Sequence, residues 1–185
     1  MTKRKALIAY VVLSLAAVFI AGCGRPPAET EGAVQVGRAA PSFKLPDLSG
    51  QEVSLDQYRG RVVMLDFWAT WCGPCRMTMP LMESIQKEYA DSLVLLAVNL
   101  QEPRDVVRDY VRAQNLHSRI LLDEEGSVGA AYGIDSIPTQ ILIDKQGVIR
   151  LIQPGYGPGT AAKLRKQIEK LAGFPVTVTD VRRTS

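Results

Sequence analysis

Runs of apolar residues of strand length alternate along the chain with longer stretches in which apolar residues recur at helical spacing. The apolar runs, which are typical of strands buried in a sheet, lie at residues 63–68, 93–100, 119–122, 139–143 and 148–152. Helical spacing recurs at residues 74–90, 102–114, 127–132 and 160–171. In the second of these helices it puts four residues on one helical face: Val106, Val107, Tyr110 and Val111. Strands that alternate with helices predict an α/β fold, and the tight turn between the last two strands makes the central sheet mixed.

Two cysteines, Cys72 and Cys75, stand three positions apart where the first buried strand gives way to a helix. A thiol at a helix N-terminus meets unpaired backbone N–H groups and the positive end of the helix dipole, and both favour the thiolate. We therefore expect Cys72 to have a lowered pKa and to be the nucleophile. Cys75, one turn further into the helix, is then the resolving thiol. The pair predicts redox chemistry on disulfides.

Other kinds of site fit the sequence less well. A CxxC pair is half of a zinc site, but zinc takes four ligands, and Cys23 and His117, the remaining cysteine and the single histidine, have no metal-ligand spacing. We therefore expect no metal, no cofactor beyond the redox-active pair, and a solvated loop position for His117. The glycine-rich residues 155–159 lack the spacing of a phosphate-binding loop, which favours a turn near the dithiol.

The segment DFWATWCGPC at residues 66–75, with Pro80 five positions on and Ile-Pro-Thr at 137–139, resembles thioredoxin. The opening APSFKLPDLSG at residues 40–50 narrows the resemblance to the membrane-tethered TlpA and ResA type of thiol-disulfide oxidoreductase, which shares this extension with the AhpC/TSA peroxiredoxins. The resemblance covers roughly residues 40–173. It implies a thioredoxin-like fold, with a mixed sheet flanked by helices, an N-terminal β extension, and a helix and strand inserted before a cis-proline loop.

The resemblance also implies the residues that meet substrate. They are Trp71, Gly73 and Pro74 around the thiols, and Ile137 and Pro138, where a cis proline opposite the dithiol leaves the preceding backbone free to pair with a substrate strand. An ordinary trans proline at the start of a strand is the alternative that base rates favour. The family context reverses that expectation.

Two positions depart from the nearest relatives. Those reductases usually carry a glutamate where this chain has Thr78, and they lack the thioredoxin aspartate that is present here as Asp66. The lysine that partners this aspartate in thioredoxin falls on Ala97. Burial without a cation raises the pKa of a carboxyl group, so we expect Asp66 to exchange a proton with Cys75. A structurally satisfied buried acid is the alternative.

Charge is concentrated at the N-terminus. The net charge of +3 comes from Lys3, Arg4 and Lys5, because the remaining 19 basic side chains match the 19 acidic ones. A neutral domain argues against nucleic acid as a partner. The apolar residues 6–22 followed by Cys23 resemble a bacterial lipoprotein signal, in which the cysteine sulfur is lipidated. An uncleaved membrane anchor and an ordinary signal peptide remain as alternatives.

We therefore expect four regions: a signal peptide or anchor at 1–22, a flexible tether at 23–37, a thioredoxin-like domain at 38–174 and a tail at 175–185. A lipoprotein signal and an uncleaved membrane anchor would both place the domain outside the cytoplasm and hold it to the membrane.

The predicted function is reduction of protein disulfides by an extracytoplasmic thiol-disulfide oxidoreductase. The resemblance implies disulfide-bearing protein substrates, with apocytochrome c during its maturation as a candidate, and a membrane-embedded thiol reductase as electron donor. Two alternatives remain open, a thiol-dependent peroxidase and a client-binding assembly factor without enzymatic activity. Peroxiredoxins carry Thr or Ser three residues before the reactive cysteine, where this chain has Ala69.

Overall fold

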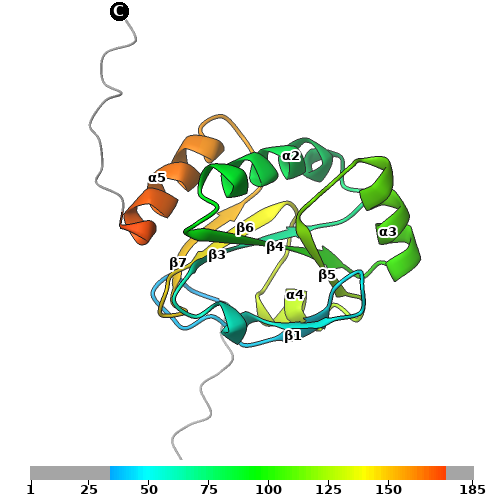
Figure 1. Cartoon of the computed structure of the whole chain (residues 1–185), viewed down its shortest axis with the longest axis horizontal. Coiled ribbons are helices and arrows are strands. Elements are labelled where there is room, and N and C mark those ends of the chain that lie inside the picture. Colours follow the sequence, from blue (N-terminus) through cyan, green and yellow to red (C-terminus); the bar gives the residue numbers. More distant parts are fainter. Residues whose placement is uncertain (1–33, 174–185) are drawn as a thin grey trace, which may run out of the picture. The chain divides into compact units, whose positions relative to one another are not determined.

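The computed structural model describes residues 34–173 (Figure 1). The predicted signal segment at 1–22, Cys23, most of the tether at 23–37 and the tail at 175–185 lie outside these residues. Among residues 34–173, the structure contains no helix that combines the length and the apolar character required to cross a membrane.

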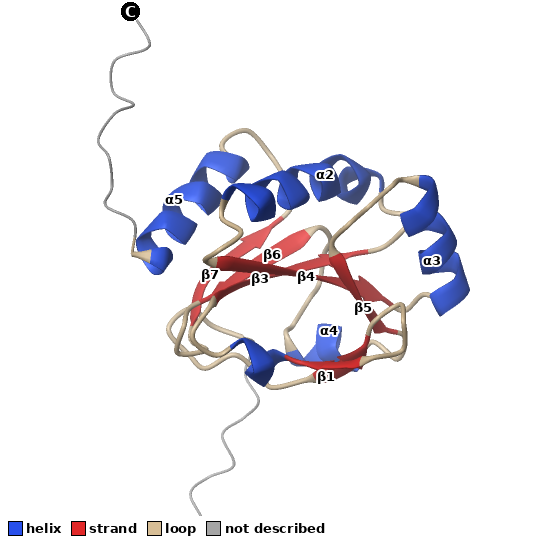
Figure 2. Ribbon diagram, viewed as in Figure 1, coloured by secondary structure: helices blue, strands red, loops and turns tan. Residues whose placement is uncertain are grey.

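A five-stranded mixed sheet forms the centre of the described region (Figure 2). In spatial order its strands are β5 (Arg119–Asp123), β4 (Leu93–Leu100), β3 (Val62–Trp68), β6 (Thr139–Ile143) and β7 (Ile149–Pro154). β4 is parallel to both β3 and β5, whereas β6 is antiparallel to both β3 and β7. In the turn from β6 to β7, Gly147 has a φ of +81°, which glycine adopts without strain. The mixed sheet that the sequence predicts is confirmed.

Other elements cover both faces of the sheet (Figure 2). The helices on one face are α2 (Gly73–Glu88), α3 (Arg104–Ala113) and α5 (Thr160–Ala172). On the other face lie α4 (Ser127–Ala131), the 3-10 helix η1 (Leu55–Tyr58) and a hairpin of β1 (Lys44–Pro46) with β2 (Glu52–Ser54). The hairpin is the expected N-terminal extension. α3 and β5 stand between β4 and the proline loop, where the resemblance implies an inserted helix and strand.

The alternation of side chains along β3 decides which residues face the helices. Leu65 and Phe67 belong to the hydrophobic cluster on the side of the hairpin and α4. Met64 and Trp68 belong to the clusters beneath α2. Asp66 lies two residues from each of them, on the same face of the strand, and therefore also faces α2.

The four apolar residues of α3 are not buried to the same degree. Val106 is 47% exposed, whereas its neighbour Val107 is fully buried. α3 packs through Val107, with Tyr110 and Val111 partly buried beside it. The strip that α3 buries is therefore narrower than the apolar pattern of its sequence.

Candidate active site

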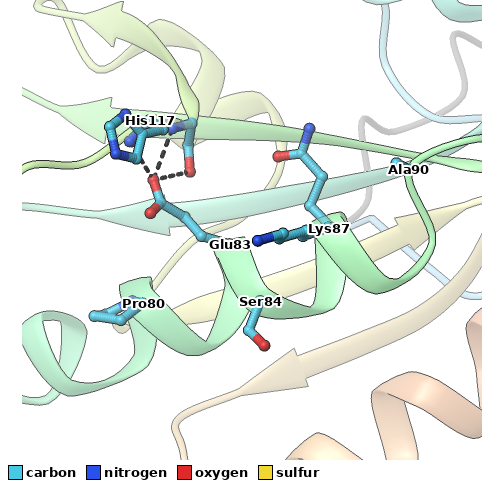
Figure 3. A pocket seen from close by; sticks show the side chains of 8 residues that line it. Pro80, Glu83, Ser84, Lys87, Ala90 and His117 are labelled. Carbon is cyan, nitrogen blue, oxygen red and sulfur yellow. Dashed lines mark hydrogen bonds between the residues drawn. The ribbon is translucent and has the colours of Figure 1, made fainter.

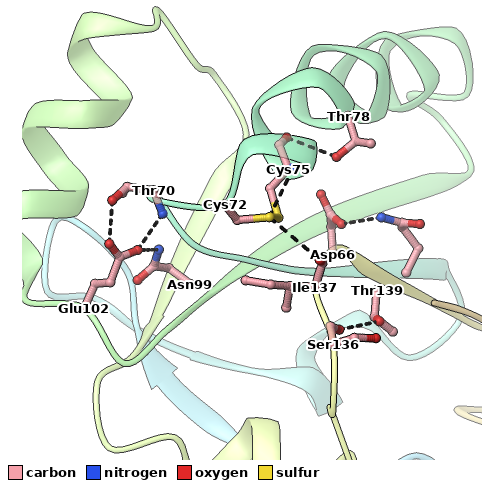
Figure 4. The surroundings of a disulfide bond; sticks show 11 residues. Asp66, Thr70, Cys72, Cys75, Thr78, Asn99, Glu102, Ser136, Ile137 and Thr139 are labelled. Atoms are coloured by element: carbon pink, nitrogen blue, oxygen red, sulfur yellow. Dashed lines mark hydrogen bonds between the residues drawn. A yellow bond between two sulfur atoms is a disulfide. The ribbon is translucent and has the colours of Figure 1, made fainter. Parts of the chain in front are cut away.

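The cysteine pair sits at the first turn of α2, immediately after the loop that leaves β3. Cys72 is the residue that caps the helix N-terminus, and its Sγ accepts the backbone N–H of Cys75 at 3.2 Å. Pro74 occupies the first turn, where a missing N–H costs nothing. Cys72 and Cys75 form a disulfide (Figure 4). The sequence predicted this helix terminus and this pairing of thiols.

The surface around the disulfide is formed by the neighbours of the two cysteines. Both cysteines are buried, at 4% exposure for Cys72 and 1% for Cys75. Trp71, by contrast, is 68% exposed, and Gly73 and Pro74 are also exposed. An exposed indole beside a shielded disulfide gives this end of the sheet an apolar contact surface.

The proline loop lies directly against the disulfide. The peptide bond between Ile137 and Pro138 is cis, as the resemblance implies. The carbonyl oxygen of Ile137 lies 3.8 Å from the Sγ of Cys72. The backbone N–H of Gly155 donates to the Pro138 carbonyl at 2.7 Å, so the glycine-rich loop also lies beside the site, as expected.

Asp66 is the buried acid of the site. It is 1% exposed, and its register partner on β4 is Ala97, so no cation stands where thioredoxin has one. Burial raises the pKa of the Asp66 carboxyl to about 7, and a hydrogen bond from Gln140 opposes that rise. The Nε2 of Gln140 donates to Oδ1 of Asp66 at 2.8 Å, whereas Oδ2 has no hydrogen-bond partner among the described residues. Figure 4 shows the Asp66 side chain pointing from β3 toward α2.

Thr78 stands where the related reductases usually carry a glutamate, and its hydroxyl is bonded to its own helix. Its side chain is fully buried on α2, and its Oγ1 donates to the carbonyl oxygen of Cys75 at 3.0 Å. The hydroxyl is thus engaged within the helix. Of the two positions that depart from the relatives, Asp66 therefore carries the titratable group.

A second buried carboxylate lies close to the site and was missed at the level of sequence. Glu102, 7% exposed, follows β4 and accepts the backbone N–H of Thr70 at 2.7 Å and the Nδ2 group of Asn99 at 2.7 Å. It also accepts the Thr70 hydroxyl. Thr70 stands two residues before Cys72, so Glu102 ties the loop that presents the cysteine to the end of β4 (Figure 4).

A surface pocket of about 390 Å³ lies elsewhere, between the second half of α2 and the loop before β5 (Figure 3). Its acidic residue, Glu83, accepts the backbone N–H groups of His117 and Ser118 at 2.6 and 2.7 Å. These bonds stabilise the loop, and His117 is exposed, as expected. Among the described residues, no group of three or more His, Cys, Asp or Glu side chains could hold a metal ion.

The structure thus brings together most of the residues that the sequence singled out, but not all of them. Cys72, Cys75, Asp66 and Ile137 meet at one end of the sheet (Figure 4), and Pro138 follows Ile137 through the cis peptide bond. Cys23 lies outside the described residues. Gln140 and Glu102 were not anticipated. For Glu102 the available signal was an acidic residue two positions after the end of a buried strand.

Comparisons with known proteins identify the family of the chain. The sequence model of the AhpC/TSA family matches residues 36–152. The thioredoxin-like protein YneN of Bacillus subtilis is 44% identical over 128 residues, which are 68% of this chain and 75% of that protein. The thiol-disulfide oxidoreductase ResA of Geobacillus thermodenitrificans is 43% identical over 124 residues, 66% of this chain and 71% of that protein.

A solved structure extends the similarity to the fold. The exposed lipoprotein thioredoxin Etrx1 of Streptococcus pneumoniae superimposes with a TM-score of 0.63 at 28% identity, over 71% of this chain and all of that one. The family match spans more than half of the chain, and the curated relatives align along about three quarters of their own length. The chain therefore belongs to the AhpC/TSA family of thioredoxin-like proteins.

Proposed function

We propose that the protein is a thiol-disulfide oxidoreductase that reduces protein disulfides on the extracytoplasmic side of a membrane. The observation that carries the proposal is the Cys72–Cys75 disulfide at the N-terminus of α2, with the proline loop on one side and buried Asp66 beneath. The chain shares 43% identity over 124 residues with ResA, a thiol-disulfide oxidoreductase, and this similarity supports the same activity.

The first step is attack by Cys72. Its thiolate attacks one sulfur of a substrate disulfide, a new S–S bond forms, and the second substrate sulfur leaves as a thiolate that takes up a proton. The N–H of Cys75 points at the Cys72 sulfur, and the first turn of α2 adds the positive end of the helix dipole. Both favour the attacking thiolate over the thiol.

The second step is resolution by Cys75. Its thiol gives a proton to Asp66, and the resulting thiolate attacks Cys72 Sγ. The Cys72–Cys75 disulfide forms as the mixed disulfide breaks, and the first substrate sulfur, which was bonded to Cys72, is released as a thiolate that takes up a proton. The substrate gains two electrons that the protein loses. With a pKa of about 7, Asp66 can both accept and return a proton near neutral pH.

The surface around Cys72 binds the substrate. The exposed residues Trp71, Gly73 and Pro74 supply apolar contact area. Ile137 is half-buried and presents its backbone beside the disulfide, where an extended substrate segment can pair with it. Disulfide-bearing proteins are therefore the substrates, and apocytochrome c is one candidate.

The proposed location rests on the N-terminal segment. The apolar run that ends at Cys23 has the pattern of a lipoprotein signal, and the similar Streptococcus pneumoniae protein is an exposed lipoprotein. A domain held outside the membrane would receive its electrons from a membrane-embedded thiol reductase. No cofactor enters the scheme, because both thiols belong to the chain.

Insulin reduction in dithiothreitol tests the activity. We expect wild type to accelerate precipitation of the insulin B chain and Cys72→Ser to abolish the acceleration. Cys75→Ser should accumulate a mixed disulfide on Cys72 without turning over. A rate in Cys72→Ser equal to that of wild type would contradict the proposal.

The two alternatives give different results. A peroxidase would consume hydrogen peroxide, yet position 69 is a buried alanine without a hydroxyl, and the Thr70 hydroxyl is bound to Glu102. We therefore expect no peroxide consumption above that of free dithiothreitol. An assembly factor that only binds clients would keep its biological activity in the Cys72→Ser, Cys75→Ser double variant, and we expect that activity to be lost.

A further inference from the structure

Gln140 is the polar side chain bonded to the buried acid. It lies on β6, two residues after Pro138, and its register partner on β3 is Asp66. Both side chains are buried, at 0% and 1% exposure. The hydrogen bond from Nε2 of Gln140 to Oδ1 of Asp66, at 2.8 Å, is therefore shielded from bulk solvent.

The elements packed around Asp66 supply no charge to it. On β4 its register partner is Ala97. α2, which covers this face, contributes the buried residues Cys75 and Thr78, and the Thr78 hydroxyl is turned to the Cys75 carbonyl. Arg76, Glu83, Lys87 and Glu88 are the charged residues of α2, and none of them is among the causes of the Asp66 pKa shift. Of Ala97, Gln140, Cys75 and Thr78, the one that titrates is Cys75 in the reduced protein.

The two oxygens of Asp66 have different surroundings. Oδ1 is held by Gln140, whereas Oδ2 has no hydrogen-bond partner among the described residues. The carboxylate is thus fixed at one oxygen and open at the other. The amide of Gln140 donates a hydrogen bond without carrying a charge. A lysine at the same distance would hold the carboxylate as an anion.

We propose that Gln140 is a positioning residue for proton transfer, whose neutral amide takes the place of a cation by fixing Oδ1 of Asp66 and leaving Oδ2 free to accept the Cys75 proton. The inference rests on the proposed function, in which Asp66 is the proton acceptor. Gln140 itself touches neither substrate nor sulfur in this scheme. It acts through the orientation and the proton affinity of Asp66.

The amide also affects how readily Asp66 gives up its proton. Burial disfavours the carboxylate, and the bond from Gln140 is the interaction that opposes this effect. Removing the donor should therefore make the carboxyl a weaker acid, so that at neutral pH fewer molecules would hold Asp66 as the base. A cation at position 140 should have the reverse effect.

The test is the pKa of Asp66 in the reduced protein, followed by ¹³C NMR of the aspartate carboxyl carbons, with Asp66→Asn to assign the signal. We expect Gln140→Leu to raise the pKa of Asp66 by about one unit, because a hydrogen bond to a charged group is lost. Gln140→Met, which keeps the length of the side chain, should do the same and serves if the leucine variant does not fold.

Gln153→Leu provides the matched control. Gln153 is the register partner of Gln140 on β7, and its side chain pairs with Lys163 rather than with Asp66. The same chemical change one strand away should leave the pKa of Asp66 unmoved. An equal pKa in wild type, Gln140→Leu and Gln140→Met would overturn the inference.

A kinetic readout separates this inference from the proposed function. The pH profile of insulin reduction should shift upward in Gln140→Leu together with the pKa of Asp66, and stay in place in Gln153→Leu. If the pKa moves while the profile does not, Gln140 has no part in proton transfer and the inference fails. The Cys72→Ser comparison, made in the same assay, tests the oxidoreductase activity independently of either result.

Discussion

Asp66 is buried without a cation beside it, so neither bulk solvent nor an opposite charge stabilises the ionised carboxylate. In an unfolded chain an aspartate has a pKa of about 4, and in the folded protein the pKa of Asp66 is about 7. The folded state therefore binds the proton more tightly. It follows that the contribution of Asp66 to stability is fully present below about pH 4 and is lost as the pH rises through about 7.

Asp66→Asn should consequently change stability in a pH-dependent way. We expect the variant to match wild type near pH 4 and to be more stable at pH 8, by on the order of 4 kcal/mol for a shift of about three pKa units. Urea unfolding of the oxidised proteins at the two pH values measures this difference. Equal stabilities at pH 8 would mean that the charged carboxylate is buried at no cost.

The same substitution should damage catalysis. Asp66→Asn removes the proton acceptor for Cys75, and general-base contributions are typically about a hundredfold or more, so we expect a loss of that size in insulin reduction. Thr78→Val is the matched control from the other side of Cys75. It removes a hydroxyl that cannot act as a base near neutral pH, and turnover should scarcely change. A large defect in Thr78→Val with none in Asp66→Asn would contradict the proton-transfer scheme.

The residue scale also shows what a sequence can predict about a site. The raised pKa of Asp66 could be anticipated, because strand alternation buries the residue and the resemblance places Ala97 beside it. Gln140 could not, because it is 74 residues away in sequence. Its contact depends on the register between β3 and β6, and a glutamine in an apolar strand gives no sign of which acid it meets.

At the scale of elements, Glu102 joins the end of β4 to the loop between β3 and α2. Its carboxylate accepts hydrogen bonds from Thr70 and Asn99. Glu102→Ala leaves the buried Asn99 donor and the half-buried Thr70 donors without this acceptor, and leaving a buried donor unsatisfied costs about 1–3 kcal/mol. We expect the free energy of unfolding to fall by at least about 2 kcal/mol, measured in urea, and the loop to present Cys72 less precisely.

The control for Glu102→Ala is Glu124→Ala. Glu124 is also an acidic residue that follows a strand, but it is exposed, and surface substitutions usually change stability by less than about 0.5 kcal/mol. If the two alanine variants lose the same small amount of stability, the hydrogen bonds of Glu102 do not hold the loop.

The elements themselves were predictable to different degrees. β3 and β4 are continuous apolar runs buried on both faces, so their bounds follow from the sequence almost residue by residue. The strands of the N-terminal hairpin have three residues each, too few for a pattern to stand out, and they were expected only from the resemblance. The exposed Val106 shows that apolar spacing defines a helix without saying how much of its surface the sheet covers.

At the scale of the whole molecule, the charge of the domain does not explain how the protein would be held to a membrane. Beyond Lys3, Arg4 and Lys5 the basic and acidic side chains balance, so no net charge draws the domain to an anionic membrane surface. The proposed attachment to a membrane therefore rests on the N-terminal segment. A lipid on Cys23 and an uncleaved membrane anchor are the two forms of attachment that its sequence suggests.

Cys23→Ser distinguishes these attachments. If Cys23 carries lipid, wild type should incorporate labelled fatty acid and remain with membranes after a high-salt wash, because salt screens charge but not apolar insertion. Cys23→Ser should lose the label and keep its signal segment, since lipoprotein-specific cleavage follows lipid attachment. Cys72→Ser is the control, because it removes another thiol without touching the signal. Labelling and processing of Cys23→Ser that match wild type would point instead to an uncleaved anchor or an ordinary signal peptide.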